Sequence, residues 1–342
     1  MFFKRAYPEV LCVGSACKDI FFPTAEAEII ETPEDITSKR KMAFELGGKY
    51  RVDDRFEAVG GVAANISTGL SRLGYTTACY SNIGDDEMGR FILGELKKEG
   101  VLTDHISLDS GAKTDLSAII VMTQNGERTI FHNRDANERL VVKAEDLKET
   151  KWLFVSSLNG AWQENLTLLL ATKKENGLSL AFNPGQHNIK EDAAAILSAV
   201  KESDVLLLNK DEAIEIVLKV APTTPHDMLD GETFLLKELF ALGAKIIGMT
   251  DGTRGSWGYD GKECWFCPIH TQRGVLDSTG AGDAFGSGFL AAFMHNQILP
   301  AALAAGMANS GSVVGFYGAS AGLLTPNELQ TLVSDIKPVR LA

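Results

Sequence analysis

The chain alternates between short, continuously apolar runs and longer segments with helical periodicity, and this alternation restricts its possible folds more than any other feature. The apolar runs span residues 9–16, 77–84, 151–158, 178–184, 204–210 and 245–252. Between them lie amphipathic segments, among them residues 61–74, 88–100 and 164–177. Strands that are apolar on both faces and alternate with helices form a parallel sheet covered by helices on both sides. The sequence therefore predicts an α/β fold whose ligands gather beyond the carboxyl ends of the strands.

Two segments interrupt this alternation. Residues 20–56 contain an apolar-polar pattern around a glycine pair at 47–48, and residues 112–135 contain another around an Asn-Gly pair at 125–126. Both patterns predict β-hairpins. We expect the two insertions to pair into a small sheet that forms a lid over the cleft at the strand ends. The chain has no low-complexity linker or internal repeat, so residues 1–342 are predicted to form one domain.

Composition excludes several classes of function. The net charge of -12 argues against nucleic-acid binding, which needs clustered basic residues. No run approaches the roughly 18–20 apolar residues of a membrane span, and the first residues do not resemble a signal peptide. We therefore expect a cytoplasmic protein that does not bind a membrane. The five cysteines predict free thiols, and Cys264 and Cys267 are interpreted as strand residues rather than zinc ligands.

The segment LDSTGAGDAF (276–285) holds small residues between two aspartates. An apolar strand precedes it and an Ala/Gly-rich helical run follows it, so the small residues fall at a helix N-terminus. Unpaired backbone N–H groups at that end, with the helix dipole, can bind a phosphoryl group. Asp283, in the first turn, could then act as general base towards an attacking hydroxyl. The alternative is that Asp283 only caps or charges the helix start.

A second glycine pair, Gly60 and Gly61, opens another predicted helix, with Asn65 in its first turns. Taken alone, this pair could be a tight strand-to-helix turn with no further role. Neither glycine-rich stretch matches the phosphate loop GxxxxGK[ST] or the dinucleotide motif GxGxxG. The second absence counts against a dinucleotide oxidoreductase.

Residues 60–84 and 277–290 together resemble the two signature segments of the ribokinase-like (PfkB) family of carbohydrate and nucleoside kinases. The resemblance extends over nearly the whole chain. It implies a ribokinase-like three-layer α/β/α fold with a mainly parallel central sheet and a small β-sheet lid. It also implies an ATP-dependent kinase that transfers the γ-phosphoryl group to a hydroxymethyl of a small sugar. Asp283 would be the general base, and the anion hole would comprise Gly280, Ala281 and Gly282.

The resemblance assigns roles to further positions. In the sugar site, Asp19 would hold substrate hydroxyls, with Gly60, Gly61 and Asn65 beside it. Asn209 and Glu212 of NKDE (209–212) would lie near Mg²⁺ and its waters, and hard oxygen ligands suit that ion. The ATP site would be formed by a nucleotide loop and an adenine-side wall, with a monovalent cation (K⁺) possible near Asp277. The residues of the loop and the wall are Thr250, Gly252, Gly255, Asn309 and Gly318.

Some residues depart from the family pattern and leave the substrate open. Val62 follows the paired glycines where ribokinases often have Lys, and FNPGQ (182–186) is closer to some nucleoside kinases. Four lid phenylalanines could stack on a base or simply pack within the lid: Phe21, Phe22, Phe44 and Phe131. A nucleoside kinase is the main alternative, and a non-catalytic sugar-binding regulator is another. Many relatives dimerise through their lids, so we predict a homodimer with Phe44 or Ile120 on the shared surface.

Overall fold

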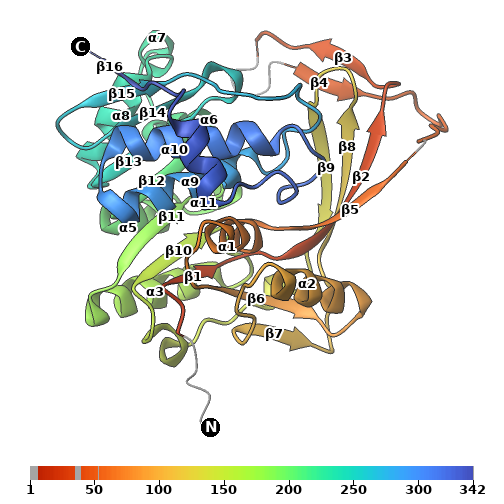
Figure 1. The fold of residues 1–342 in the computed structure, drawn as a ribbon, viewed down its shortest axis with the longest axis horizontal. Helices are drawn as coiled ribbons and strands as arrows, with labels where there is room; N and C mark the ends of the chain where they lie inside the picture. The colour runs from red at the N-terminus through yellow and green to blue at the C-terminus, as the bar shows by residue number, and fades with distance from the viewer. Residues whose placement is uncertain (1–6, 35–39, 53, 342) are drawn as a thin grey trace.

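A computed structural model describes residues 7–34, 40–52 and 54–341 and contains a ten-stranded central sheet (Figure 1). Its order is β16-β15-β14-β13-β12-β11-β10-β1-β6-β7. Seven strands are parallel: β1 (Val10–Val13), β6 (Thr77–Gly84), β7 (Ile106–Asp109), β10 (Trp152–Ser156), β11 (Ser179–Asn183), β12 (Val205–Asn209) and β13 (Ile246–Thr250). Three antiparallel strands extend one edge: β14 (Ser256–Tyr259), β15 (Cys264–Cys267) and β16 (Val339–Arg340). The predicted, mainly parallel sheet is confirmed.

Helices cover both faces of this sheet and enclose two apolar cores. One face packs against α1 (Val62–Arg72), α2 (Glu87–Lys98), α9 (Ala281–Asn296), α10 (Leu299–Val313) and α11 (Pro326–Val333). The other packs against α3 (Trp162–Asn176), α5 (Ala193–Glu202), α6 (Lys210–Val220) and α8 (Glu232–Ala241), with the short α4 (Gln186–Glu191) and α7 (His226–Leu229) nearby. The central strands are buried on both sides, as their continuous apolar sequences require. The three-layer prediction is confirmed.

A separate four-stranded sheet stands beside the strand ends, with the order β5-β2-β8-β9. It consists of β5 (Phe56–Gly60), β2 (Cys17–Thr24), β8 (Leu116–Met122) and β9 (Arg128–Asn133). The two central strands, β2 and β8, run parallel, and the outer pairs are antiparallel. We call this sheet the lid. The predicted small separate sheet is confirmed, as is the hairpin that turns at residues 125–126.

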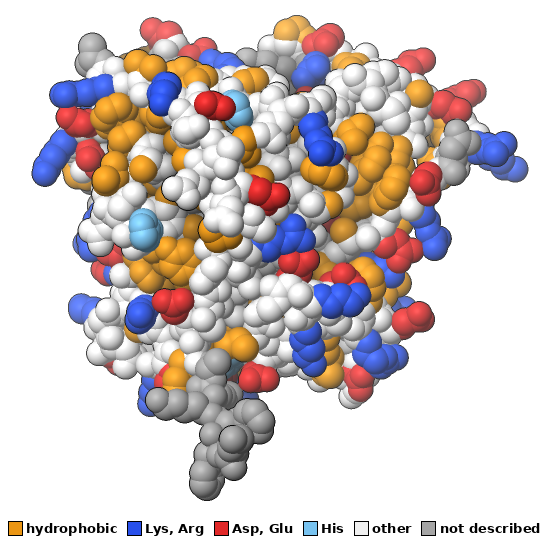
Figure 2. All heavy atoms as spheres, viewed as in Figure 1, with side chains coloured by type: hydrophobic (Ala, Val, Ile, Leu, Met, Phe, Trp, Pro, Cys, Tyr) orange, Lys and Arg blue, Asp and Glu red, His pale blue; other side chains and the backbone are white. Residues whose placement is uncertain are grey.

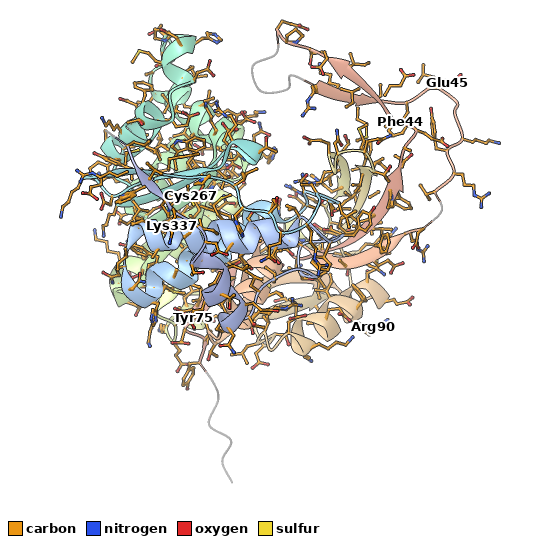
Figure 3. The ribbon with its side chains drawn as sticks, turned by 45° about the horizontal axis from the view of Figure 1, so that its top comes forward. Phe44, Glu45, Tyr75, Arg90, Cys267 and Lys337 are labelled. Atoms are coloured by element: carbon orange, nitrogen blue, oxygen red, sulfur yellow. The ribbon has the colours of Figure 1, made fainter. Side chains whose placement is uncertain are left out.

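The predicted hairpin at residues 47–48 is wrong. Strand β4 (Arg40–Ala43) pairs instead with the preceding β3 (Glu28–Glu31), in a two-stranded sheet of its own. The glycine pair lies in an isolated turn, where the Glu45 backbone N–H donates to Tyr50 Oη over 2.7 Å and the Tyr50 ring meets the Phe44 ring edge-on. An aromatic pair thus closes this turn, whereas a hairpin would have needed a strand after it. Figure 3 shows Phe44 and Glu45 at the outer margin of the lid, away from the sheet body.

The cysteines and the helices agree with two further expectations. All five cysteines fall in the described residues and are free thiols. The predicted strand residues Cys264 and Cys267 are buried in β15, and Figure 3 shows Cys267 inside the main body. Across residues 7–34, 40–52 and 54–341, no helix has the length and apolar character needed to cross a membrane.

Candidate active site

The glycine pair between β5 and α1 allows the lid and the main sheet to meet closely. A Cβ atom on Gly60 would lie 2.0 Å from Asp19 Oδ2, so a side chain there would overlap the carboxylate. Gly61 has φ +91°, and a Cβ atom on it would lie 2.5 Å from the Ser15 carbonyl oxygen. Both positions therefore require glycine for space, and Gly61 requires it for conformation as well. The pair brings the start of α1 to the carboxylate of Asp19.

The start of α9 has the geometry of an anion-binding helix end. Gly280 adopts a left-handed conformation with φ +75°, and a Cβ atom there would lie 2.3 Å from Ala319 Cβ. The Ala281 backbone N–H donates to the Ser278 carbonyl oxygen over 3.3 Å. Helix geometry leaves the amides of Gly282 and Asp283 without intrahelical partners. Gly282 is exposed and a Cβ atom there would meet open space, so of the three predicted amides that of Gly282 is open to an anion, whereas that of Ala281 is already engaged.

Asp283 and Asn65 join the two glycine-rich segments. The Asn65 side-chain amide donates to Asp283 Oδ2 over 2.7 Å, across 218 residues of sequence. The Asp283 side chain is partly exposed, but the protein around it is dense enough to raise its pKa to about 6 by desolvation. The hydrogen bond from Asn65 and the charge of Arg128 act in the opposite direction. A carboxyl group with this pKa is ionised near neutral pH and basic enough to accept a proton from a hydroxyl.

Asp19 lies on β2 of the lid and is 5% exposed. Burial raises its pKa, and hydrogen bonds with Ser117 and Cys17 partly oppose that rise. The Cys17 thiol donates to Asp19 Oδ1 over 3.3 Å. The charge of Asp19 makes a small further contribution to the raised pKa of Asp283, after desolvation. A polar substrate between them would meet carboxylates from both the lid and the main domain.

Asn209 and Glu212 begin helix α6 as a capping box. Asn209 Oδ1 accepts from the Glu212 backbone N–H, and Glu212 Oε2 accepts from the Asn209 backbone N–H, both over 2.9 Å. Glu212 is 9% exposed, and desolvation raises its pKa to about 8. Within the described chain, no three His, Cys, Asp or Glu residues are arranged to hold a metal ion by themselves. A metal here would need ligands from phosphate and water as well as from the protein.

The predicted nucleotide loop follows β13, whose last residue, Thr250, pairs with Asn209. Gly252 and Gly255 both have positive φ angles, +48° and +111°. A Cβ atom on Gly255 would lie 2.5 Å from the Cys267 carbonyl oxygen, so this glycine lets the loop pack on β15. The loop therefore lies at the same sheet edge as Asn209.

The two residues predicted for the adenine-side wall are engaged within the protein. Asn309 is fully buried: its Nδ2 donates to the Ala284 carbonyl oxygen, and its Oδ1 accepts from the Leu324 backbone N–H. This placement makes Asn309 a brace between α9 and α10 and argues against direct contact with adenine. Gly318 donates its backbone N–H to Asp277 Oδ2 over 3.0 Å, so this amide is engaged within the protein.

Sequence reasoning missed Arg128, the first residue of β9. Together with residues of β3, β4 and the predicted nucleotide loop, it lines a cavity of about 670 Å³. Its charge lowers the pKa values of both Asp19 and Asp283, against the larger effect of burial on each. The period-2 alternation of β9 could have placed residues 128, 130 and 132 on the face of Asp19. No motif distinguished this arginine from an ordinary surface residue after a turn.

The fold and the site define a phosphotransferase with an alcohol group as acceptor: a carboxylate stands beside a helix start rich in free amides, across the strand ends from a glycine-rich loop. Residues 9–326 match the model of the pfkB family of carbohydrate kinases, and the chain belongs to this family of ATP-dependent sugar kinases.

Similar proteins agree with this assignment. One relative is a 5-dehydro-2-deoxygluconokinase from Geobacillus thermodenitrificans, 27% identical over 82% of this chain and 86% of the relative. The ADP complex of a ribokinase from Cryptococcus neoformans var. grubii superposes with a TM-score of 0.76 at 24% identity, over 95% and 99% of the two chains. A Burkholderia thailandensis nucleoside kinase with inosine gives 0.77 at 18% identity, over 95% and 98%. At these identities the solved structures show the fold alone, which is ribokinase-like.

Proposed function

We propose that this kinase transfers the γ-phosphoryl group of Mg-ATP to a hydroxymethyl group of a small sugar, with Asp283 as general base. The observation that carries the proposal is the 2.7 Å hydrogen bond from Asn65 to Asp283, because it joins the candidate sugar helix to the candidate base. Asp19 would hold substrate hydroxyls from the lid side. Gly60 and Gly61 would let the sugar lie against the backbone.

In the proposed reaction, Asp283 accepts the hydroxyl proton as the oxygen attacks the γ-phosphorus. The free amides at the start of α9 stabilise the negative charge on the phosphoryl oxygens, because they are fixed in place before the reaction. The lid limits access of water, which would otherwise compete with the sugar as acceptor. Thr250, Gly252 and Gly255 form the loop along which the nucleotide would lie.

The residues at the start of α6 fit a magnesium ion bound mainly through water. Glu212 is a buried carboxyl group whose pKa is raised by desolvation and by the charges of Glu215 and Asp211, and Asn209 supplies a neighbouring amide oxygen. Mg²⁺ usually keeps several waters and binds substrate phosphates, which agrees with this small set of protein oxygens. When bound, the ion would neutralise phosphate charge, while Glu212 would orient its water.

A monovalent cation such as K⁺ is proposed beside Asp277. This carboxylate is fully buried and accepts the backbone N–H groups of Thr279 and Gly318 over 2.9 and 3.0 Å. The Thr279 hydroxyl is buried and has no hydrogen-bond partner among the described residues. An uncompensated buried oxygen next to a buried carboxylate is suited to a cation. Turnover should therefore be higher in KCl than in NaCl at equal ionic strength, and equal rates would contradict this site.

The lid favours a sugar over a nucleoside as substrate. Phe21 is fully buried in the lid core, and Phe22 and Phe131 alternate onto the face opposite Asp19. Phe44 packs against Tyr50 at the outer margin. None of these four phenylalanines is presented to the site for stacking on a base, so the packing alternative describes them better.

The proposal is tested by measuring ATP consumption with ribose, fructose, 2-keto-3-deoxygluconate, 5-dehydro-2-deoxygluconate, adenosine and cytidine. We expect one of the sugars or sugar acids to give the highest kcat/KM. A nucleoside with the highest kcat/KM would establish the alternative. ATP consumption that no acceptor stimulates would contradict the proposed function itself.

A homodimer through the lid and a cytoplasmic location complete the proposal. Hydrophobic side chains gather over the lid in Figure 2. The face opposite Asp19 carries a set of partly or fully exposed apolar residues: Ile20, Phe22, Ala118, Ile120 and Phe131. A second copy would cover this apolar face. Phe44 lies outside this set, so Ile120 is the better of the two predicted contact residues.

A further inference from the structure

A cavity of about 250 Å³ lies beside β5, the edge strand of the lid. Its walls come from β5, α1, α2 and the loop that follows α10. Strand β5 contributes Glu57, helix α1 contributes Asn65 and Thr68, and helix α2 contributes Glu95 and Glu99. The two aspartates proposed to hold and to deprotonate the sugar do not line it. This cavity is therefore separate from the candidate sugar site.

Two buried polar side chains on α1 line the cavity and have unused hydrogen-bonding groups. Thr68 is 4% exposed, and its side chain forms no hydrogen bond with any residue that the structure describes. Its neighbour Ser67, by contrast, donates to the Ala64 carbonyl oxygen over 2.9 Å, as hydroxyl groups in helices often do. Asn65 is 6% exposed; its Nδ2 donates to Asp283, and no described residue donates to its Oδ1. Buried polar groups normally have partners, so both side chains indicate a ligand in the cavity.

The charges around the cavity favour a neutral ligand. Three carboxylates line it, and each already has a cation at 2.5 to 3.0 Å. These partners are Lys18 and Arg55 for Glu57, Lys98 for Glu95, and Arg72 for Glu99. Because the carboxylates are paired, the cavity has little net attraction for an ion. A carboxylate can accept several hydrogen bonds at once, so these oxygens can still bind hydroxyl groups.

The rest of the lining is apolar. It includes the aromatic rings of Phe91 and Tyr317 and the side chains of Val59 and Leu96. The cavity is smaller than the roughly 300–1,000 Å³ typical of sites for drug-sized ligands. Apolar walls with hydroxyl acceptors at the rim suit a compact molecule that has C–H groups on one side and hydroxyl groups on the other.

We propose that this cavity is a second ligand site, which binds a neutral polyol of monosaccharide size and assists phosphoryl transfer through Asn65. The effect on transfer rests on the proposed function, whereas the binding does not. A hydroxyl group of the ligand donates to Asn65 Oδ1 while Asn65 Nδ2 donates to Asp283. Hydrogen bonds that form a chain strengthen one another, so the ligand stabilises the ionised form of Asp283. Thr68 orients the ligand beside Asn65.

The effect on Asp283 should appear in the pH profile. The other charged groups that act on this carboxylate are Arg128 from β9, Asp19 from β2 and Glu212 from α6. None of these three lines the cavity, so a ligand there reaches Asp283 through Asn65. With the best acceptor, myo-inositol should raise kcat/KM about twofold at pH 5 and leave it unchanged at pH 8.5, where the carboxyl group is already ionised. Myo-inositol has no hydroxymethyl group, so it cannot serve as the acceptor itself.

Binding is measured by calorimetry with myo-inositol and xylitol in the absence of nucleotide. Thr68→Val and Glu95→Gln should each weaken binding about 3- to 10-fold. Glu87→Gln makes the same charge change on α2 outside the cavity and should match wild type. Asp19→Asn removes the proposed contact in the sugar site and should leave polyol binding unchanged. The last two variants separate this cavity from the sugar site and from a general effect of charge.

Four results would overturn the inference. Wild type binds neither polyol at tens of millimolar, or it binds ethylammonium chloride in their place. Asp19→Asn abolishes binding while Thr68→Val retains it, or a bound polyol leaves the pH profile unchanged. If turnover requires Asp283 but polyols do not bind, the proposed function stands and the inference fails. If no acceptor is phosphorylated but binding still depends on Thr68 and Glu95, the proposed function fails and the second ligand site stands.

Discussion

Replacing Asn65 should change the pH at which the enzyme loses activity, because Asn65 stabilises the ionised form of Asp283. The pKa of Asp283 is about 6, and the Asn65 hydrogen bond of 2.7 Å is the largest influence that holds it down. A hydrogen bond to a charged group contributes about 1.5 kcal/mol or more. That free energy corresponds to roughly one pH unit in the midpoint of ionisation. Asn65→Leu should therefore move the acidic limb of kcat/KM from near pH 6 to near pH 7.

The sign follows from the role of the base. Only ionised Asp283 can accept the hydroxyl proton, so activity falls as the pH falls through its pKa. At pH 8.5 the wild-type and variant carboxyl groups are both ionised, and any remaining deficit reports the lost contact between Asn65 and the sugar. At pH 6 the variant should lose about fivefold more than it does at pH 8.5, and about tenfold more at pH 5.

The assay is kcat/KM against pH from 5 to 9 with the best acceptor, in a buffer of constant ionic strength. Thr68→Val, one turn further along α1, serves as a control for the loss of a polar group from the same helix. Its acidic midpoint should match that of wild type. An Asn65→Leu profile that is lower at every pH but unchanged in midpoint would refute the electrostatic argument and leave Asn65 as a substrate contact only.

Three further predictions follow from the site and the lid. Asp283→Asn should lower turnover about 10²-fold or more while Mg-ADP affinity is retained, and a loss of only a few-fold would reduce Asp283 to a helix-terminus residue. Glu212→Gln should raise the Mg²⁺ concentration needed for half-maximal activity. The pKa of Glu212 is about 8 in the folded protein, above its value in an unfolded chain. Wild type should therefore lose stability relative to Glu212→Gln as the pH rises from about 5 to 8. Melting temperatures of the two proteins that change equally with pH would contradict the raised pKa. Ile120→Asp should shift light scattering towards monomer with the catalytic constants retained, and a wild-type monomer at micromolar concentration would overturn the lid dimer.

The central sheet could be predicted from sequence because its physical signal is local. Strands such as β6 and β12 are apolar throughout, and helices such as α1 and α3 begin close to their predicted residues. The lid was harder, since strand pairing there depends on partners far apart in sequence. The pattern around residue 42 indicated a strand correctly, but its partner lies upstream in β3. Nothing in the local alternation distinguishes an upstream partner from a downstream one.

The candidate site shows the same division. Glycines at 60, 61 and 280 could be singled out from their positions at predicted helix starts, and the structure shows that a side chain at each would overlap its neighbours. The engagement of the Ala281 amide could not be predicted, because its bond to Ser278 depends on the shape of the preceding loop. The sequence could not show whether Asn309 contacts a ligand or joins two helices, since a buried asparagine and one that faces a cleft occur in the same sequence pattern. Arg128 could be recognised only from the structure, where its buried Nε atom has no hydrogen-bond partner among residues 7–34, 40–52 and 54–341.

The lid contacts two segments that lie beside the candidate anion-binding start of α9. On one side, Ser278 is held by Gly126 and Arg128. On the other, the Tyr317 ring stacks on Phe56 of β5, with centroids 4.4 Å apart, and the next residue, Gly318, donates to Asp277. Strand β5 also carries Gly60, whose backbone lies against Asp19. A sugar that binds at Asp19 would therefore contact the same sheet that holds Ser278 and Tyr317 beside the proposed phosphoryl site. Its binding energy can then stabilise the position of these segments during transfer as well as the bound sugar itself.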